Sequence, residues 1–494
     1  MLDLNKVNKL ICTLRHYCHS YHEKNKLEKF LQYSSVLCNL QYIINQTYCD
    51  DDIENDCIEI ANKLKSKEFK DILNSDLPKK EEFDENCVFF YDNFGLDTRG
   101  LHLIYLKALC KLNKKIVYIT VNSARGHQPS VGAIARVNSN LSVVYIDNIS
   151  QTDYLKILVE NFQKYRPKHA FFYSQPNDVA GTIAFCLYSG LVNRYQVNLT
   201  DHAFWLGKCA FDICLEFRNY GATISKKWRK IPLEKLRILP YYPIINMDEP
   251  FAGFPFDPTN KKIIFSGGSI YKTEGEDNKF FKIADSLLEK TNDTVFLFAS
   301  NQSSLPLENL LKKHPNRAYH ISERKDLFQL MRNITVYLNT YPLGGGLMTQ
   351  YASVAGKIPY ALKFDDCNFG LLIGEEKLEC IFDDEDSLIS DMVKSLEDEQ
   401  YLKDKELKLK GTVISEEHFN REIENLLSNK DSSFSIIINE SLDTKHFRDV
   451  YLTRFTFFNL FYKVLVNKNV MNLAVRYPLP FIAKVVRKVI RFIH

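Results

Sequence analysis

Residues 337–356 read YLNTYPLGGGLMTQYASVAG, with three consecutive glycines between an apolar run and a helical pattern. Gly344, Gly345 and Gly346 have no Cβ, so the backbone there can turn tightly and approach a ligand. The first turn of the following helix would offer N–H groups without intrahelical partners to an anion. The stretch therefore predicts a loop that binds the phosphates of a nucleotide. A plain strand-to-helix turn is the alternative, and a glycine triplet alone does not separate the two.

The length and composition indicate a large folded protein. The 494 residues are too many for one core and predict two or three domains. Apolar residues make up 45% and aromatic residues 13% of the chain, which argues against disorder. The sequence has no G-x-x-x-x-G-K-[ST] motif and no G-x-G-x-x-G motif opening a helix, so P-loop hydrolysis and ordinary dinucleotide binding are disfavoured.

Charge and cysteine usage narrow the class of protein further. The net charge is +3, but eight Lys or Arg and no Asp or Glu follow Asp449, so residues 1–449 sum to 3 − 8 = −5. A body of negative net charge argues against a nucleic-acid partner. The twelve cysteines contain no C-x-x-C pair and predict neither a zinc site nor a disulfide framework. Without a signal peptide or a long apolar segment at any point, we expect a cytoplasmic protein.

Two series of alternating strands and helices follow a helical N-terminal region. Such alternation predicts α/β domains with parallel sheets covered on both faces. The expected strands of the first series are Cys87–Tyr91, Ile116–Val121, Leu141–Ile146, Ala170–Tyr173 and Tyr195–Leu199. Those of the second series are Lys262–Phe265, Thr294–Phe298, Ala318–Ile321, Ile334–Leu338 and Ile358–Leu362.

These patterns predict two Rossmann-like domains facing a cleft, in which a ligand of one domain could react with a ligand of the other. Four prolines in Tyr241–Asn260 indicate a linker between them. The expected divisions are a helical region 1–84, a first domain 85–245, a linker 246–260, a second domain 261–430 and a C-terminal extension 431–494.

A resemblance to a known family rests on the loop that ends the first strand of the second series. This loop, Phe265-Ser266-Gly267-Gly268-Ser269-Ile270-Tyr271-Lys272, and the later Asn-Thr-x-Pro-Leu-x-x-Gly pattern from Asn339 occur in the order of a family motif. The chain resembles glycosyltransferases of the glycosyltransferase B (GT-B) fold, in particular O-GlcNAc transferase, the bacterial N-glycosyltransferases that modify adhesins, and bacterial surface-polysaccharide glycosyltransferases. The segments Trp205-Leu206-Gly207 and Asn93–Asp97 resemble further pieces of the family.

The resemblance implies that Lys272 holds the donor diphosphate. The His-Thr-Thr that contacts phosphate in the family is Gly346-Leu347-Met348 here, so backbone amides must take over that contact. Tyr351 stands at the position of the ribose-binding aspartate, with two polar neighbours as substitutes. The expected donor-binding residues are Gly268, Ser269, Lys272, Gly344, Gly345, Gly346, Thr349, Gln350 and Tyr351.

Two residues are candidates for the base that takes the acceptor proton. Asp97 is preferred, because it follows a strand end and precedes a helix that can orient it; it also aligns with the family's histidine. His202, after the fifth strand, is the rival, since an ordinary histidine titrates nearer to pH 7. The structural alternatives are helix capping for Asp97 and a hydrogen-bonded histidine beside Trp205 for His202.

The C-terminal residues YPLPFIAKVVRKVIRFIH have an apolar face and a basic face at helical spacing. This pattern is typical of an amphipathic helix that lies on an anionic membrane surface. The alternative is a terminal helix that packs on the two domains. We therefore expect a peripheral protein at the inner face of the membrane.

Together these observations predict a metal-independent hexosyl- or N-acetylhexosaminyltransferase without a cofactor, whose nucleotide sugar is a co-substrate. The expected acceptor is a lipid-linked or surface polysaccharide. A protein (adhesin) glycosyltransferase and a non-catalytic nucleotide-sugar-binding partner subunit are the alternatives. The sugar, the nucleotide, the stereochemical outcome and the oligomeric state stay open.

Overall fold

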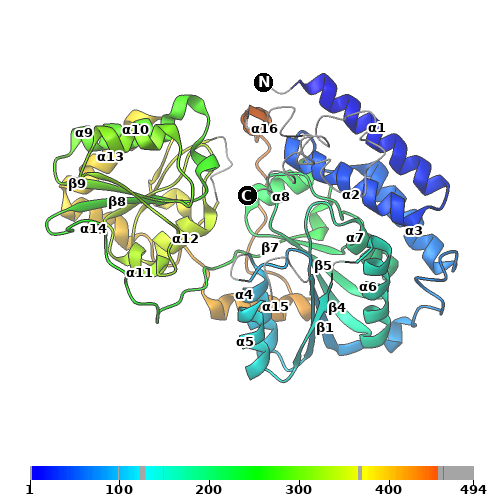
Figure 1. Ribbon diagram of the computed structural model, residues 1–494. Helices are drawn as coiled ribbons and strands as arrows, with labels where there is room; N and C mark the ends of the chain where they lie inside the picture. The colour runs from blue at the N-terminus through cyan, green and yellow to red at the C-terminus, as the bar shows by residue number, and fades with distance from the viewer. Residues whose placement is uncertain are drawn as a thin grey trace, which may run out of the picture. The chain divides into compact units, whose positions relative to one another are not determined.

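The computed structural model describes residues 3–97, 100–121, 128–147, 149–364, 370–453 and 460. They form two α/β units (Figure 1). Unit 1 comprises Met1–Leu239, Asn420–Ile438 and Tyr451–His494, and unit 2 comprises Pro240–Phe419 and Asn439–Val450. The amphipathic pattern expected near the C-terminus lies outside the described residues.

The helical N-terminal region belongs to unit 1. It contains α1 (Leu4–Glu23), α2 (Leu27–Ile44) and α3 (Asp51–Lys65). The apolar faces of these helices join the core that also covers the sheet, and α3 packs against the sheet-covering helix α7 (Val179–Leu187). Residues 1–84 are therefore part of the first α/β unit.

Unit 1 is built on a parallel sheet that has seven strands among the described residues, in the order β3-β2-β1-β4-β5-β6-β7. The helices α6 and α7 lie on one face and α4 and α5 on the other (Figure 1). The strands are β1 (Asp84–Asp92), β2 (Lys115–Val121), β3 (Leu141–Ile146), β4 (Pro167–Tyr173), β5 (Asn193–Asn198), β6 (Ile213–Glu216) and β7 (Leu236–Ile238). The remaining helices are α4 (His102–Lys111), α5 (Pro129–Val137), α6 (Gln151–Tyr165) and α8 (Asn219–Lys227).

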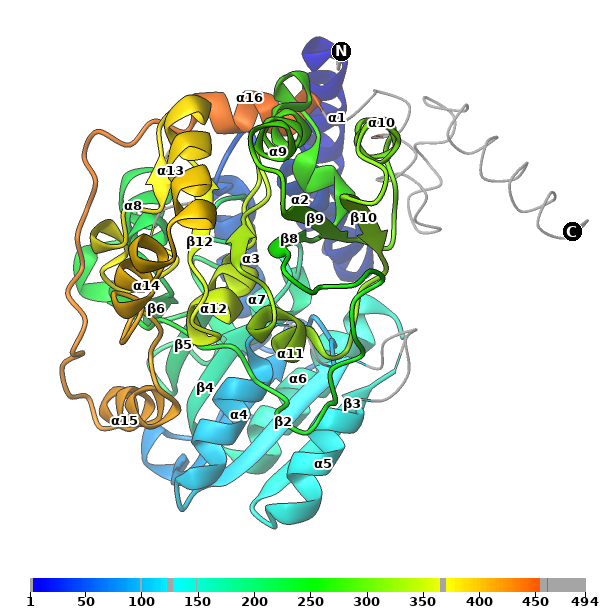
Figure 2. The ribbon, with the colours of Figure 1, turned by 90° about the vertical axis from the view of Figure 1, so that its left-hand side faces the viewer.

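Unit 2 repeats this architecture with a parallel sheet that has six strands in its described part, in the order β10-β9-β8-β11-β12-β13. The helices α9, α10 and α13 cover one face, and α11 and α12 lie side by side on the other (Figures 1 and 2). The strands are β8 (Lys262–Gly267), β9 (Thr294–Ala299), β10 (Ala318–Ile321), β11 (Val336–Leu338), β12 (Pro359–Leu362) and β13 (Ile381–Phe382). The helices are α9 (Lys279–Lys290), α10 (Leu305–Lys313), α11 (Leu327–Arg332), α12 (Gly346–Val354), α13 (Glu385–Glu397) and α14 (Glu399–Leu407); α15 (Glu416–Leu427) and α16 (Lys445–Thr453) run from unit 2 into unit 1.

The predicted α/β architecture with two parallel sheets is confirmed, and every expected strand is present. The sequence pattern did not predict the short strands β6, β7 and β13, although it predicted β10 and β11, which are no longer than β6. No helix of the described ranges is both long and apolar enough to cross a membrane.

The structure draws its divisions differently from the sequence pattern. The expected linker 246–260 lies within unit 2, because Phe251, Phe254 and Phe256 pack against the core of that sheet. Residues 420–438 return to unit 1, where Phe434 and Ile436 pack on the apolar cluster around Trp205.

Candidate functional site

The glycine loop of unit 2 lies beside the loop that follows β8. The strands β8 and β11 are parallel neighbours, so both loops leave the same edge of the sheet. The Nζ of Lys272 donates a 3.3 Å hydrogen bond to the carbonyl of Gly344, although 72 positions separate the two residues. The structure thus brings the predicted diphosphate-binding lysine against the glycine triplet.

The backbone before Lys272 is fixed by a single 3-10 turn, Ile270–Thr273. Gly268 has φ +150°, a backbone conformation that residues with a Cβ rarely adopt. Ser269 is exposed, and its carbonyl accepts from the N–H of Lys272 at 2.9 Å. These contacts hold Lys272 close to the end of β8.

One buried amide, that of Asn339, organises the glycine loop. Its Oδ1 accepts from the N–H of Thr340 at 3.0 Å and from the N–H of Gly345 at 2.8 Å. Its Nδ2 donates to the hydroxyl of Thr349 at 3.3 Å. The N–H of Gly345 is therefore used inside the protein. An anion could instead meet the first-turn N–H groups of α12 that precede Thr349, whose N–H makes a helical bond to Gly345.

The other predicted donor residues on α12 hold the backbone of unit 2. The Nε2 of Gln350 donates to the carbonyl of Tyr241 at 3.0 Å, and the hydroxyl of Tyr351 donates to the carbonyl of Ile244 at 2.6 Å. Both contacts fix residues 241–244 on α12. The buried Oε1 of Gln350 has no hydrogen-bond partner among the described residues.

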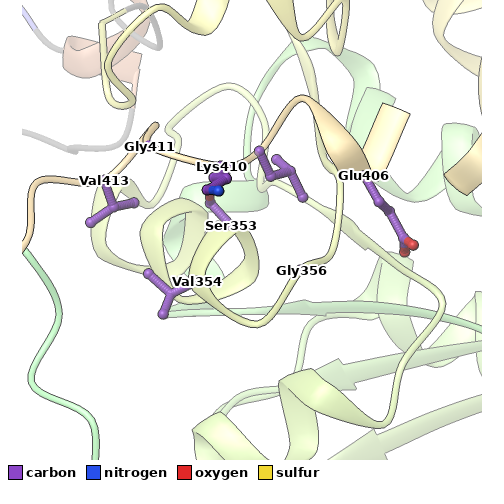
Figure 3. A pocket seen from close by; sticks show the side chains of 8 residues that line it. Ser353, Val354, Gly356, Glu406, Lys410, Gly411 and Val413 are labelled. Carbon is purple, nitrogen blue, oxygen red and sulfur yellow. The ribbon is translucent and has the colours of Figure 1, made fainter. Parts of the chain in front are cut away.

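A cavity of about 310 Å³ lies at the far end of α12 from the glycine loop (Figure 3). It adjoins the end of α14. Its lining residues are Ser353, Val354, Gly356, Glu406, Leu409, Lys410, Gly411 and Val413. None of the predicted donor-binding residues lines this cavity.

In unit 1, Asp97 binds the first turn of α5. Its Oδ1 accepts from the N–H of Ser130 at 2.8 Å, and its Oδ2 accepts from the hydroxyl of Ser130 at 3.0 Å. Its carbonyl also contacts Nε2 of His102 at 3.1 Å. Both carboxylate oxygens are engaged as in a helix cap, which favours the capping role over the basic one.

His202 is oriented by the residue that precedes it. Its Nδ1 lies 3.3 Å from Oδ1 of Asp201, and its side chain is 33% exposed. Arg218 Nε donates to the other oxygen of Asp201 at 2.6 Å. Burial alone would raise the pKa of Asp201, but the charge of Arg218 and the hydrogen bonds outweigh it and hold that pKa well below its usual range. An ionised Asp201 accepts from Nδ1–H, which places the basic lone pair of His202 on Nε2.

A buried guanidinium holds the loop around His202. Arg229 is fully buried, and its Nη2 donates to three carbonyls of this loop, those of Thr200, Asp201 and Ala203, at 3.3, 3.1 and 2.7 Å. The carbonyl of His202 itself accepts from the amide of Asn45 at 3.1 Å. The loop is thus fixed on both sides of the imidazole.

Sequence reasoning missed Asn339, Asp201, Arg218 and Arg229 as parts of the candidate sites. Asn339 is the first residue of the Asn-Thr-x-Pro-Leu-x-x-Gly motif, and Asp201 directly precedes His202, so their strand-end positions were a usable signal. Arg218 and Arg229 lie well beyond His202 in the sequence, and no motif around them indicated that they belong to its site. Within the described ranges, no group of three or more His, Cys, Asp or Glu side chains could hold a metal ion.

Neither a protein-family model nor a curated protein matches the sequence. The fold matches solved structures, including a glycosyltransferase from Rickettsia africae at 12% identity and TM-score 0.52, covering 70% of this chain and 99% of that chain. An O-GlcNAc transferase from Thermobaculum terrenum matches at 12% identity and TM-score 0.51, with 91% and 82% covered. A protein assigned as a UDP-N-acetylglucosamine 2-epimerase from Listeria monocytogenes matches at 10% identity and TM-score 0.51, with 72% and 100% covered.

Proposed function

We propose that this chain, which has the GT-B fold, is a glycosyltransferase that binds a nucleotide sugar at the glycine loop of unit 2. The observation that carries the proposal is the contact between Lys272 and Gly344, which joins a cation to a glycine loop at a helix N-terminus. The names of the three solved structures support a UDP-sugar as the donor, since two are transferases and the third is named for UDP-N-acetylglucosamine.

The residues of this site suit a departing nucleoside diphosphate. Negative charge grows on the diphosphate as the bond to the sugar breaks. The ammonium of Lys272 and the first-turn N–H groups of α12 are fixed donors that can stabilise this charge. The acceptor oxygen forms the new bond to the anomeric carbon, and its proton goes to a base.

We assign this base to His202, in place of Asp97. The Nε2 lone pair can accept the proton, and the ionised Asp201 stabilises the imidazolium that results. Asp97 instead positions α5 through Ser130.

For the acceptor we keep a lipid-linked or surface polysaccharide, which the basic C-terminal sequence supports. A protein acceptor and a non-reacting nucleotide-sugar binder are the competing proposals. Incubation with UDP-sugars and a panel of lipid-linked sugars and adhesin peptides, followed by mass spectrometry, separates them. Binding without turnover over the whole panel would favour the non-reacting binder, and an epimerised sugar nucleotide would favour an epimerase.

The donor site is tested by calorimetry with UDP. Lys272→Met removes a charge-assisted contact worth about 1.5–3 kcal/mol, so affinity should fall about 10- to 150-fold. Lys282→Met, on the exposed side of α9, is the matched control and should bind like the native chain. Equal affinities in all three proteins would remove the glycine loop from the proposal.

A further inference from the structure

Two cysteines of unit 1 lie almost at bonding distance. The sulfur atoms of Cys186 and Cys209 are 2.6 Å apart. The sulfurs of a disulfide are about 2.05 Å apart, so only a small movement separates this pair from a covalent bond. Cys186 lies in the last turn of α7, and Cys209 lies in the loop that carries His202.

The backbones that carry the two cysteines are fixed by one guanidinium. Arg194 Nη1 donates to the carbonyl of Phe185, next to Cys186, and to the carbonyl of Cys209, at 3.1 Å each. The side chain of Arg194 is itself 4% exposed and paired with Asp212 at 2.7 Å. The guanidinium therefore holds the end of α7 and the loop together.

A carboxylate from a third element fixes the same loop. Glu54 of α3, which is buried, accepts from the N–H groups of Gly207 and Lys208 at 2.8 Å each and from that of Cys209 at 3.0 Å. With Glu54 and Arg194 in place, Cys209 has little freedom to turn away from Cys186. The thiols are thus pre-positioned by contacts that do not involve sulfur.

We propose that Cys186 and Cys209 are the site of a reversible disulfide. Cys209 is the more exposed of the two and reacts first. Its thiolate attacks a small-molecule disulfide such as oxidised glutathione, forms a mixed disulfide and releases one glutathione thiol. The thiolate of Cys186 then attacks the Cys209 sulfur and releases the second glutathione. The protein loses two electrons and two protons, and oxidised glutathione gains them as its disulfide is reduced to two thiols.

The disulfide would tie the His202 loop to α7 covalently. The bond closes a short stretch of chain, which restricts the unfolded state and stabilises unit 1. Because burial raises the pKa of Cys209 well above its ordinary value, the reaction should be slow at neutral pH. A reducing thiol should open the bond again.

The test uses the full chain incubated with oxidised glutathione, then unfolded, alkylated and mapped by mass spectrometry without reduction. We expect a cross-linked peptide that joins Cys186 to Cys209 and disappears with dithiothreitol. Oxidation should also raise the Tm by about 5 °C. Both effects should be absent from Cys209→Ser and present in Cys12→Ser, which removes an exposed thiol of α1.

Cys12 also reports that the oxidant has reacted. If Cys12 carries glutathione while Cys186 and Cys209 are both still alkylated, the proposal is overturned. A glutathione adduct that persists on Cys209 would overturn it too, because Cys186 would then have failed to displace it. Because the cross-linked peptide is sought in the native chain, this test gives a result even if the Cys209→Ser variant does not fold.

Discussion

The loop that carries His202 is held by buried charges, whereas the buried side-chain support of the glycine loop of unit 2 is a neutral amide. In the first loop Asp201 pairs with Arg218, and Arg229 binds three carbonyls. In the second, Asn339 binds two N–H groups and one hydroxyl. A charged support fails when one partner is removed, since the other charge stays buried. A neutral support loses only hydrogen bonds when it is removed.

The largest expected effect comes from breaking the charged support. Arg218→Gln leaves Asp201 buried without its cation and should lower the free energy of unfolding by about 3–5 kcal/mol. Arg166→Gln removes an exposed ion pair with Glu82 and should cost at most about 1 kcal/mol. Denaturant unfolding of both variants measures the difference. Similar losses would mean that the buried pair contributes no more than a surface pair.

The same pair gives a pH dependence of known sign. The pKa of Asp201 is lower in the folded than in the unfolded protein, so its stabilising contribution is complete above about pH 4, the pKa of an unfolded aspartate. It is lost as the pH falls further. Unfolding curves between about pH 5 and pH 3 should therefore show a steeper loss of stability in the native chain than in Arg218→Gln. Parallel curves would contradict the assignment.

The next effect compares the two candidate bases within unit 1. His202→Gln removes the proposed base and should lower turnover about 100-fold with unchanged affinity for UDP. Asp97→Asn keeps the shape and one acceptor oxygen towards Ser130, and turnover should stay within a few-fold of the native value. Rates measured under saturating donor give the comparison. A large loss in Asp97→Asn and a small one in His202→Gln would return the base to Asp97.

The two loops also differ in what the sequence could predict. The glycine loop was predicted because its residues are contiguous and their chemistry is local, and Lys272 followed from a family motif. Asn339 stands inside that motif, but its contacts to Thr340 and Gly345 depend on how the loop turns. The support of His202 comes from its neighbour Asp201 and from Arg218, Arg229 and Asn45. The last three lie on other segments of the chain, and the sequence gives no spacing that links them to His202. For Asp97, the deciding contact with Ser130 lies 33 positions away.

A smaller effect is expected from removing the neutral support. Asn339→Ala leaves the buried N–H groups of Thr340 and Gly345 without their acceptor and should destabilise unit 2 by about 1–3 kcal/mol. UDP should also bind more weakly, because the loop is no longer fixed. Asn333→Ala, at the exposed end of α11, is the control. If Asn333→Ala weakens UDP binding as much as Asn339→Ala does, the loss of affinity does not come from the glycine loop.

The smallest effects separate two neighbouring glycines. A Cβ on Gly346 would lie 2.9 Å from Leu371 Cδ2 and 3.1 Å from the hydroxyl of Tyr241. Gly346→Ala should therefore cost about 1 kcal/mol, the lower end of the usual cost of overpacking, because the half-buried Leu371 side chain can shift. A Cβ on Gly345 would meet nothing closer than 3.5 Å, so Gly345→Ala should be nearly neutral for folding. Melting temperatures of the two variants test this order, and equal shifts would contradict it.

The division of the chain between the units has a consequence for biosynthesis. Unit 1 begins at the N-terminus, yet its core also needs Phe434 and Ile436, and Arg237 is paired with the buried Glu422. A ribosome must therefore translate all of Pro240–Phe419 before the first unit can close. During that interval Phe434 and Ile436 are not yet available to pack on the apolar cluster around Trp205. Premature termination before residue 420 would leave unit 1 without Asn420–Ile438 and unit 2 without Asn439–Val450, so neither unit would be complete.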